Sequence, residues 1–334
     1  MTERIKTTVV GSYPVPSWLP GNTSRLVLRD AVMVVLKTQE LAGLDLIADG
    51  ELSRFDPGHP EANGMVDYFV AQMDGIRTRF SMADLQRFYH DRALGVRSLP
   101  AGMVTGKVEA GTLNLAGDYE SVRALTTFPL KFTCTGPHML SRVLVDCYYK
   151  DRADLAMDIA QVLRQQLESV EADVVQLDEA YIVGHPEDTA WAAEAINHVL
   201  DGVPNETGVH VCYGNYGGQT AQRGFWRDLV PFLNNLHADH LVLEFARRGY
   251  DELDVFRDLN PNIRLGIGVV DIKDNEVESP QLIAGRIEMI VKTLGEPRLK
   301  YIHPDCGFWM LHRSVVDRKM QALVQGRDLF EGRP

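Results

Sequence analysis

The chain has 334 residues, of which 45% are hydrophobic and 24% are charged, and its formal net charge at pH 7 is −12. This composition is typical of a globular protein with a large core, and the negative balance argues against nucleic acid or an anionic membrane surface as the main partner, because both bind basic faces. The four cysteines are too few for a secreted disulfide framework, and neither a signal-peptide core nor a run of about 18 apolar residues occurs, so we expect a cytoplasmic protein with reduced thiols.

Short apolar runs that end in small or polar residues alternate with longer segments of helical periodicity, such as 155–170 and 282–294. Eight runs are predicted to be strands, at residues 7–14, 44–51, 130–137, 173–180, 208–215, 240–247, 264–271 and 299–306. Strands that alternate with helices imply parallel pairing through right-handed crossovers. Eight such units predict a closed (β/α)8 TIM barrel that takes up residues 1–334 as one domain.

Residues 56–129 do not follow this alternation. Helical stretches are predicted near 64–73 and 81–94, and a β-hairpin is predicted over 102–115 with Gly111 near its bend. We interpret the segment as an excursion between the second and third barrel strands, in a position to cover the mouth of the barrel.

The functional groups of a TIM barrel gather at the carboxyl ends of its strands. The predicted strands end in residues able to do chemistry, namely Ser12, Glu51, the turn 135–137, Asp178, Glu179, Cys212, Glu244, Asp271 and Cys306. Strand ends also border loops, which are polar in any protein, so each single residue keeps a purely structural interpretation. A glycine-rich turn at 215–219 could give backbone N–H groups to a ligand.

His210 and Cys212 stand two apart in one strand, so their side chains project from the same face. Imidazole and thiolate are ligands that suit zinc. This pair alone favours the plainer interpretation of a buried free cysteine beside a hydrogen-bonded histidine. Glu244 ends a strand otherwise unable to host a charge, where a carboxylate is costly unless paired or bound to metal. Cys306 ends the last strand, and the four would make a zinc site with two sulfur ligands, one nitrogen and one oxygen.

The chain resembles the catalytic barrel of cobalamin-independent methionine synthase over about residues 7–310. The motifs stand in the order of that family: "TTVVGSYP", "ADGE", "TGP", "VVQLDEA", "HVCYGN", "LEFA" and "HPDCG". The resemblance implies a catalytic zinc held by four side chains: His210, Cys212, Glu244 and Cys306. It also implies that homocysteine is held by four residues: Gly11, Ser12, Glu51 and Asp178.

Two departures from the family bear on the methyl donor. The chain has only the catalytic barrel, like the short forms of the family, some of which take a methyl group from a methylated corrinoid. Lys273 stands where the long enzymes have a histidine proposed to protonate the leaving folate nitrogen, and a corrinoid leaves as reduced cobalt without needing a proton. The donor is therefore a methylcorrinoid or methyl-folate, which another protein could deliver. The candidate catalytic residues are Lys273 and Asp271, the latter placed with Asp305 to orient the zinc histidine.

Ligand charge explains why sulfur suits this chemistry. A free alkyl thiol has a pKa near 8.5, and coordination to zinc deprotonates it. Zinc with two cysteinates and a neutral histidine sums to zero, so a bound substrate thiolate brings the site to −1 and stays electron-rich. Glu244 would fill the fourth position at rest and yield it to substrate. Glu51 and Asp178 suit the ammonium group of homocysteine, although salt bridges with rim arginines such as Arg54 are an alternative.

Three other functions stay open. A zinc enzyme that alkylates coenzyme M with an epoxide needs a cationic pocket for the sulfonate, and Arg247, Arg248 and Lys273 leave that possible. A metal-free decarboxylase of the related uroporphyrinogen barrel would not need the two cysteines and the glutamate. A non-catalytic zinc protein would have a closed site of four ligands with no adjoining pocket.

Overall fold

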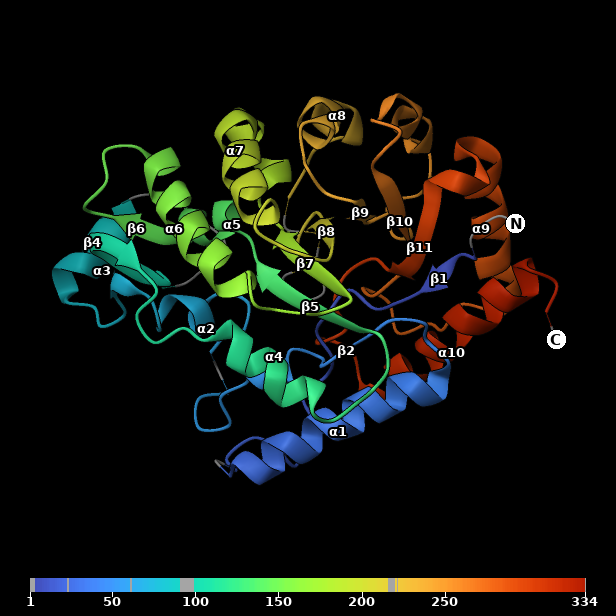
Figure 1. Ribbon diagram of the computed structural model, residues 1–334, viewed down its shortest axis with the longest axis horizontal. Coiled ribbons are helices and arrows are strands. Elements are labelled where there is room, and N and C mark those ends of the chain that lie inside the picture. The colour runs from blue at the N-terminus through green and yellow to red at the C-terminus, as the bar shows by residue number, and fades with distance from the viewer. Residues whose placement is uncertain are drawn as a thin grey trace.

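A computed structural model describes residues 4–22, 24–60, 62–90, 99–215, 220 and 222–333. Its centre is an eight-stranded sheet in the order β1-β11-β10-β9-β8-β7-β5-β2, and every strand pair in it is parallel. Figure 1 shows the sheet curled, with helices around its outside and the two chain ends near each other. The predicted α/β architecture built on a parallel sheet is therefore confirmed.

The strands of this sheet are β1 (Lys6–Thr7), β2 (Ile47–Ala48), β5 (Leu130–Thr135), β7 (Val174–Glu179), β8 (Glu206–Val211), β9 (His240–Leu243), β10 (Arg264–Val270) and β11 (Leu299–Pro304). A second sheet holds β3 (Asp74–Arg77), β4 (Gly102–Glu109) and β6 (Leu144–Asp146). The α-helices are α1 (Arg25–Ala42), α2 (Asp67–Val70), α3 (Met82–His90), α4 (Leu115–Arg123), α5 (Pro137–Arg142), α6 (Arg152–Leu167), α7 (Thr189–Leu200), α8 (Trp226–Asn234), α9 (Pro280–Leu294) and α10 (Arg313–Phe330). Within the described residues, no helix has the length and apolar character needed to cross a membrane.

Each of the eight predicted strands falls on a strand of the large sheet, but the first two are much shorter than predicted. The ladder of β2 stops at Ala48, and Gly50 and Glu51 then take positive φ angles of 74° and 60°. The Tyr13 N–H, from the segment after β1, donates to the Gly50 carbonyl at 3.0 Å. Both segments therefore leave the ladder early, which places Glu51 in a left-handed conformation that a non-glycine residue adopts only at a cost.

The central strands are buried on both faces because helices cover the sheet. All six residues of β7 are buried, including Gln176, Asp178 and Glu179. Helix α6 packs Leu155, Ile159 and further apolar residues into the core. Polar side chains in such a strand need partners inside the protein, and these partners define the candidate site.

The two edges of the large sheet approach each other near the N-terminus. An isolated parallel bridge joins Thr8, just after β1, to Leu46, just before β2. The Leu46 N–H donates to the Thr7 carbonyl at 3.2 Å. A barrel closed around all eight strands and its extent as a single domain stay predictions, which this bridge supports.

The predicted hairpin over 102–115 is wrong. Residues 102–109 form the single strand β4, which pairs antiparallel with β3 and parallel with β6. The chain does not return as a strand, because Asn114 caps α4 by accepting a hydrogen bond from the Gly117 N–H at 3.1 Å. The helix predicted near 64–73 is the short α2, and that at 81–94 is α3, although its last predicted residues lie outside the described part of the chain.

Candidate metal centre and acidic pocket

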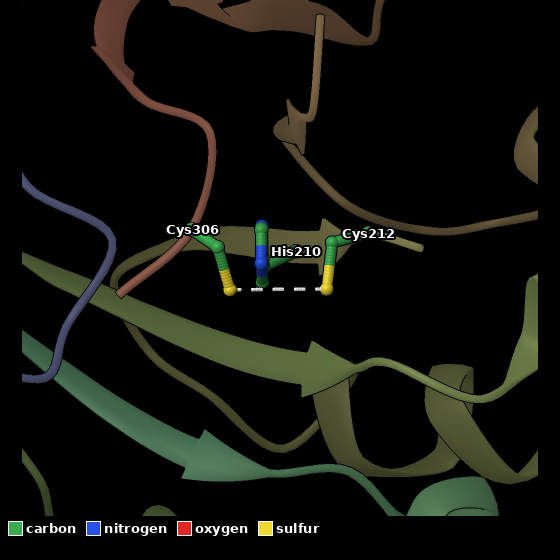
Figure 2. A group of neighbouring side chains, drawn as sticks. All are labelled: His210, Cys212 and Cys306. Atoms are coloured by element: carbon green, nitrogen blue, oxygen red, sulfur yellow. Dashed lines mark hydrogen bonds between the residues drawn. The ribbon is translucent and has the colours of Figure 1, made fainter. Parts of the chain in front are cut away.

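The structure brings three of the four predicted metal ligands together. The donor atoms of His210, Cys212 and Cys306 all lie within 4.8 Å of one another, and the two sulfurs are 3.9 Å apart. Figure 2 shows the imidazole and the two sulfurs gathered in one space, with Cys306 reaching in from the segment after β11. Because β8 and β11 are separated by two strands in the sheet, the curl of the sheet is what allows this meeting.

The protonation of His210 leaves a free lone pair directed into this group. Its Nδ1 lies 2.9 Å from the Val242 carbonyl oxygen, which can only accept, so Nδ1 carries the proton. Its Nε2 is buried and has no hydrogen-bond partner among the described residues. A buried polar atom without a partner is costly. Bonding to a metal would satisfy it.

The spacing of the sulfurs also fits zinc. Two sulfurs that are each about 2.3 Å from a tetrahedral zinc lie roughly 3.8 Å apart, close to the 3.9 Å between Cys212 and Cys306. The contact with Cys212 and burial raise the pKa of the Cys306 thiol well above its ordinary value. Without a cation the Cys306 thiol would therefore stay protonated, whereas a divalent cation reverses this and holds it as a thiolate.

Glu244, the fourth predicted ligand, is not part of this group among the described residues. It is fully buried, its Oε1 lies 2.7 Å from the Lys273 ammonium, and its Oε2 accepts the Tyr213 backbone N–H at 3.1 Å. Lys273 is thus an ion-pair partner of Glu244, and the charges of Glu244, Cys306 and Cys212 raise its pKa against the opposing effect of burial.

The prediction that Asp271 and Asp305 orient His210 is wrong, because the Val242 carbonyl does so. Asp305 is buried and accepts the backbone N–H groups of residues 245–247 at 2.7–2.9 Å. Asp271 pairs with Arg247 at 3.1 Å and accepts the Lys273 N–H at 2.8 Å. Both carboxylates therefore fix the loops that follow β9 and β10.

Two of the four predicted substrate residues, Asp178 and Ser12, lie next to residues of the metal group. Asp178 on β7 is in register with His210 on β8, and Ser12 lies against Gly307, next to Cys306, where any side chain would overlap its hydroxyl. A side chain at Gly11 would likewise overlap the Glu51 carboxylate. The two glycines therefore let the chain pass close to these polar groups. Residues 216–219 of the predicted glycine-rich turn lie outside the described residues.

Glu51 and Asp178 form an acidic pair in which Asp178 is buried and Glu51 is partly buried. Burial raises the pKa of Glu51 to about 7; the charge of Arg54 opposes this, and the charges of Asp178 and Asp49 add to it. Burial also raises the pKa of Asp178, against the opposing effects of the hydrogen bond from Gln176 and the charge of Arg54. A cationic group entering between the two carboxylates would lower both pKa values. The pair is therefore suited to bind an ammonium group. Arg54, predicted as an alternative partner, partly offsets the negative charge of the two carboxylates.

The sequence analysis missed the support of this acidic pair. Gln176 donates to the Asp178 Oδ1 at 2.8 Å, and Lys131 on β5 donates to the Gln176 Oε1 at 2.9 Å and to the Val9 carbonyl at 2.5 Å. Burial lowers the pKa of Lys131 to about 7. The signal was present in the sequence, since a lysine and a glutamine interrupt the strands "LKFTCT" and "VVQLDE". Such residues in a buried strand need each other or a ligand.

Comparisons with known proteins agree on one family. The family model described as the catalytic domain of cobalamin-independent synthase matches residues 5–327. A methionine synthase of Thermococcus kodakarensis is 30% identical over 97% of this chain and 93% of its own length. One of Pyrococcus furiosus is 30% identical over 96% of this chain and 91% of its own length.

Solved structures show the same fold. The structure of a B12-independent methionine synthase from Shewanella in complex with selenomethionine superposes with a TM-score of 0.80 at 23% identity, covering 99% of this chain and 98% of that one. A putative vitamin-B12 independent methionine synthase from Listeria monocytogenes gives a TM-score of 0.72 at 17% identity, covering 98% of each chain. At these identities the likeness concerns the fold alone.

Proposed function

Because the chain belongs to the cobalamin-independent methionine synthase family, we propose that it transfers a methyl group to the sulfur of homocysteine at a zinc ion held by His210, Cys212 and Cys306. The observation that carries the proposal is the buried, unpartnered Nε2 of His210 beside two sulfurs 3.9 Å apart. Zinc at this position would lower the pKa of the substrate thiol and hold it as a thiolate. Two cysteinates and one neutral histidine leave such a site uncharged, so the added thiolate keeps its nucleophilicity.

We propose that the acidic pair positions the substrate. Glu51 and Asp178 would bind the ammonium group of homocysteine, and the register of Asp178 with His210 supports a position of that group near the metal. Gln176 keeps Asp178 oriented through its hydrogen bond. The same proposal includes a closed (β/α)8 barrel as the frame, because such a frame gathers the carboxyl ends of its strands, β8 and β11 among them, at one mouth.

The methyl donor that fits best is a methylcorrinoid, with methyl-folate as the alternative. A folate leaving group needs a proton on its nitrogen, and Lys273 stands at the position of the residue that would donate this proton. The pairing with Glu244 raises the pKa of Lys273, so its ammonium holds the proton tightly and is a weak acid for this step. A corrinoid leaves as reduced cobalt and makes no such demand.

The cationic side chains near the site already have partners within the protein, which argues against coenzyme M as the methyl or alkyl acceptor. Arg247 pairs with Asp271 at 3.1 Å, and the guanidinium of Arg248 lies 3.4 Å from the centre of the Tyr213 ring. Lys273 pairs with Glu244. A sulfonate would have to compete with these partners, whereas the ammonium group of homocysteine meets two carboxylates.

The test combines metal content with product formation. Purified wild type should carry one zinc per chain and form methionine from homocysteine with methylcobalamin or with methyl-folate, as measured by mass spectrometry. Cys306→Ser should lose both. Cys147→Ser, which changes an exposed thiol outside the group, is the matched control and should keep both. Full zinc content with no methionine from either donor, but turnover of coenzyme M with an epoxide, would overturn the proposal.

A further inference from the structure

We propose that Lys273 is a positioning residue that holds Glu244 away from the metal, so that one coordination position stays open for the substrate sulfur. This inference rests on the proposed function for the identity of the metal and the thiol. It differs from the ligand set of the resemblance, in which the glutamate corresponding to Glu244 binds the resting zinc.

The contacts of Glu244 leave little of its carboxylate for a cation at the metal centre. One oxygen lies 2.7 Å from the Lys273 ammonium, and the other accepts the Tyr213 backbone N–H at 3.1 Å. The side chains of Lys273 and Glu244 are 2% and 0% exposed, so water does not compete for either. The pair is therefore held in a low-dielectric space, where separating the two charges is costly.

The backbone fixes the position of the Lys273 side chain. The Lys273 N–H donates to the Asp271 carboxylate at 2.8 Å, and the Asp271 N–H donates to Glu278 at 2.7 Å. Glu278 in turn pairs with the buried Lys319 of α10 at 2.8 Å. The loop after β10 is thus tied to a core helix, and Asp271, predicted to be catalytic, acts as an anchor of this loop.

The net charge of the zinc site shows how the ion pair between Lys273 and Glu244 favours binding of the substrate thiolate. With Glu244 neutralised by Lys273, a zinc site of two cysteinates and one neutral histidine has no net charge, and only the substrate adds −1. If Glu244 were a ligand, the resting site would already be at −1, and the substrate would have to displace a buried carboxylate. Lys273 therefore removes a competitor for the fourth position before the thiol arrives.

The experiment measures metal and thiol binding rather than turnover. Zinc affinity is measured by chelator competition on the full-length holoenzyme, and homocysteine binding is followed by the visible spectrum of the Co²⁺-substituted protein. Lys273→Met should tighten zinc about tenfold and raise the homocysteine concentration needed for the spectral change about tenfold, because Glu244, left without its cation, turns to the metal.

Two further variants keep the test decisive. The double variant Lys273→Met with Glu244→Gln removes both charges and should restore wild-type values, and Lys273→Arg, which keeps the cation, should behave as wild type. A tenfold or greater loss of zinc in the double variant would overturn the inference, since Glu244 would then be a resident ligand. The proposed function fails separately, if the wild type binds no zinc or forms no methionine.

Discussion

The described residues hold two clusters of potential metal ligands, one after β7 and one at the ends of β8 and β11, and the clusters differ in the partners that their donor atoms already have. His185, Glu187 and Asp188 lie after β7, and their ligand atoms are as close together as those of the His210, Cys212 and Cys306 group. The closeness of the ligand atoms therefore does not show which of the two clusters binds a metal.

The His185 cluster is saturated by cations of its own chain. Asp188 accepts from the Arg142 Nε at 2.6 Å and lies 2.9 Å from the Nε2 of the buried His138. Glu187 lies 3.2 Å from Arg142 and 3.1 Å from His185. Burial alone would lower the pKa of His138, but its contacts with Asp188 and Glu179 outweigh this and raise it. In the His210 group, by contrast, two thiols and a bare Nε2 face one another. A metal site is marked by donors that the protein leaves unclaimed.

Loss of a metal ligand should have the largest effect. Cys306→Ser should reduce zinc affinity by more than the roughly 10–100-fold that loss of an outer-shell partner costs, and methyl transfer should disappear with the metal. In the other cluster Asp188→Asn should leave zinc content at the wild-type level. Zinc per chain after dialysis against a chelator measures both. Equal zinc loss in the two variants would erase the contrast between the clusters.

The same Asp188→Asn change should instead destabilise the fold. It leaves Arg142 and the charged form of His138 without their shared carboxylate in a buried setting, which costs about 3 kcal/mol. Urea denaturation of the zinc-loaded protein at pH 6 should show this loss, with the m-value unchanged. Because Asp188 holds the pKa of His138 up, the effect should shrink as the pH rises above that pKa. Unchanged stability at pH 6 would mean that the cluster is not a structural ion-pair network.

The ionised Glu51 carboxylate should lower the free energy of unfolding, although it is needed to bind the substrate. Its pKa is near 7 in the folded protein against an ordinary value of 4.5, so the folded state holds the proton more tightly than the unfolded chain. The resulting penalty is absent below pH 4.5, grows between pH 4.5 and 7, and is complete above pH 7, where it amounts to roughly 3 kcal/mol.

Glu51→Gln should therefore raise the free energy of unfolding at pH 8 by roughly 3 kcal/mol and have little effect at pH 4.5, both measured without homocysteine. Its homocysteine KM at pH 8 should rise, because the ammonium group loses a carboxylate. A variant that is no more stable than wild type at pH 8 would contradict the burial of an ionised Glu51.

Lys131 should have the smallest effect, since it acts on Asp178 through Gln176. Lys131→Met removes one hydrogen bond to Gln176 and should raise the homocysteine KM about fivefold, the equivalent of ~1 kcal/mol, with kcat little changed. A fall in kcat at unchanged KM would place Lys131 in the chemical step instead. Steady-state kinetics at saturating methyl donor separate the two results.

The pattern of the sequence predicts much of the frame and part of the site. The eight apolar runs fall on the eight strands, because β-strands buried on both faces are continuous apolar segments. The spacing of His210 and Cys212 predicts their common face. Their meeting with Cys306, 94 residues away, was expected from the predicted barrel, which gathers strand ends at one mouth, and from the family resemblance, since no local rule relates the ends of β8 and β11.

Other features depend on contacts that no spacing encodes. The ion pair between Glu244 and Lys273 joins residues 29 positions apart, and it decides whether the glutamate is free for the metal. The predicted hairpin failed because the partner of β4 was β3, some 30 residues earlier, rather than the segment that follows Gly111. In both cases the partner was chosen by the tertiary fold, and local pattern could not identify it.

X-ray absorption at the zinc edge tests the central claim most directly, because it counts the sulfur atoms bound to the metal. Zinc held by His210, Cys212 and Cys306 should show two sulfur ligands in the enzyme alone and three after homocysteine is added. A sulfur count that stays at two in the presence of saturating homocysteine, or that is below two without it, would contradict the account.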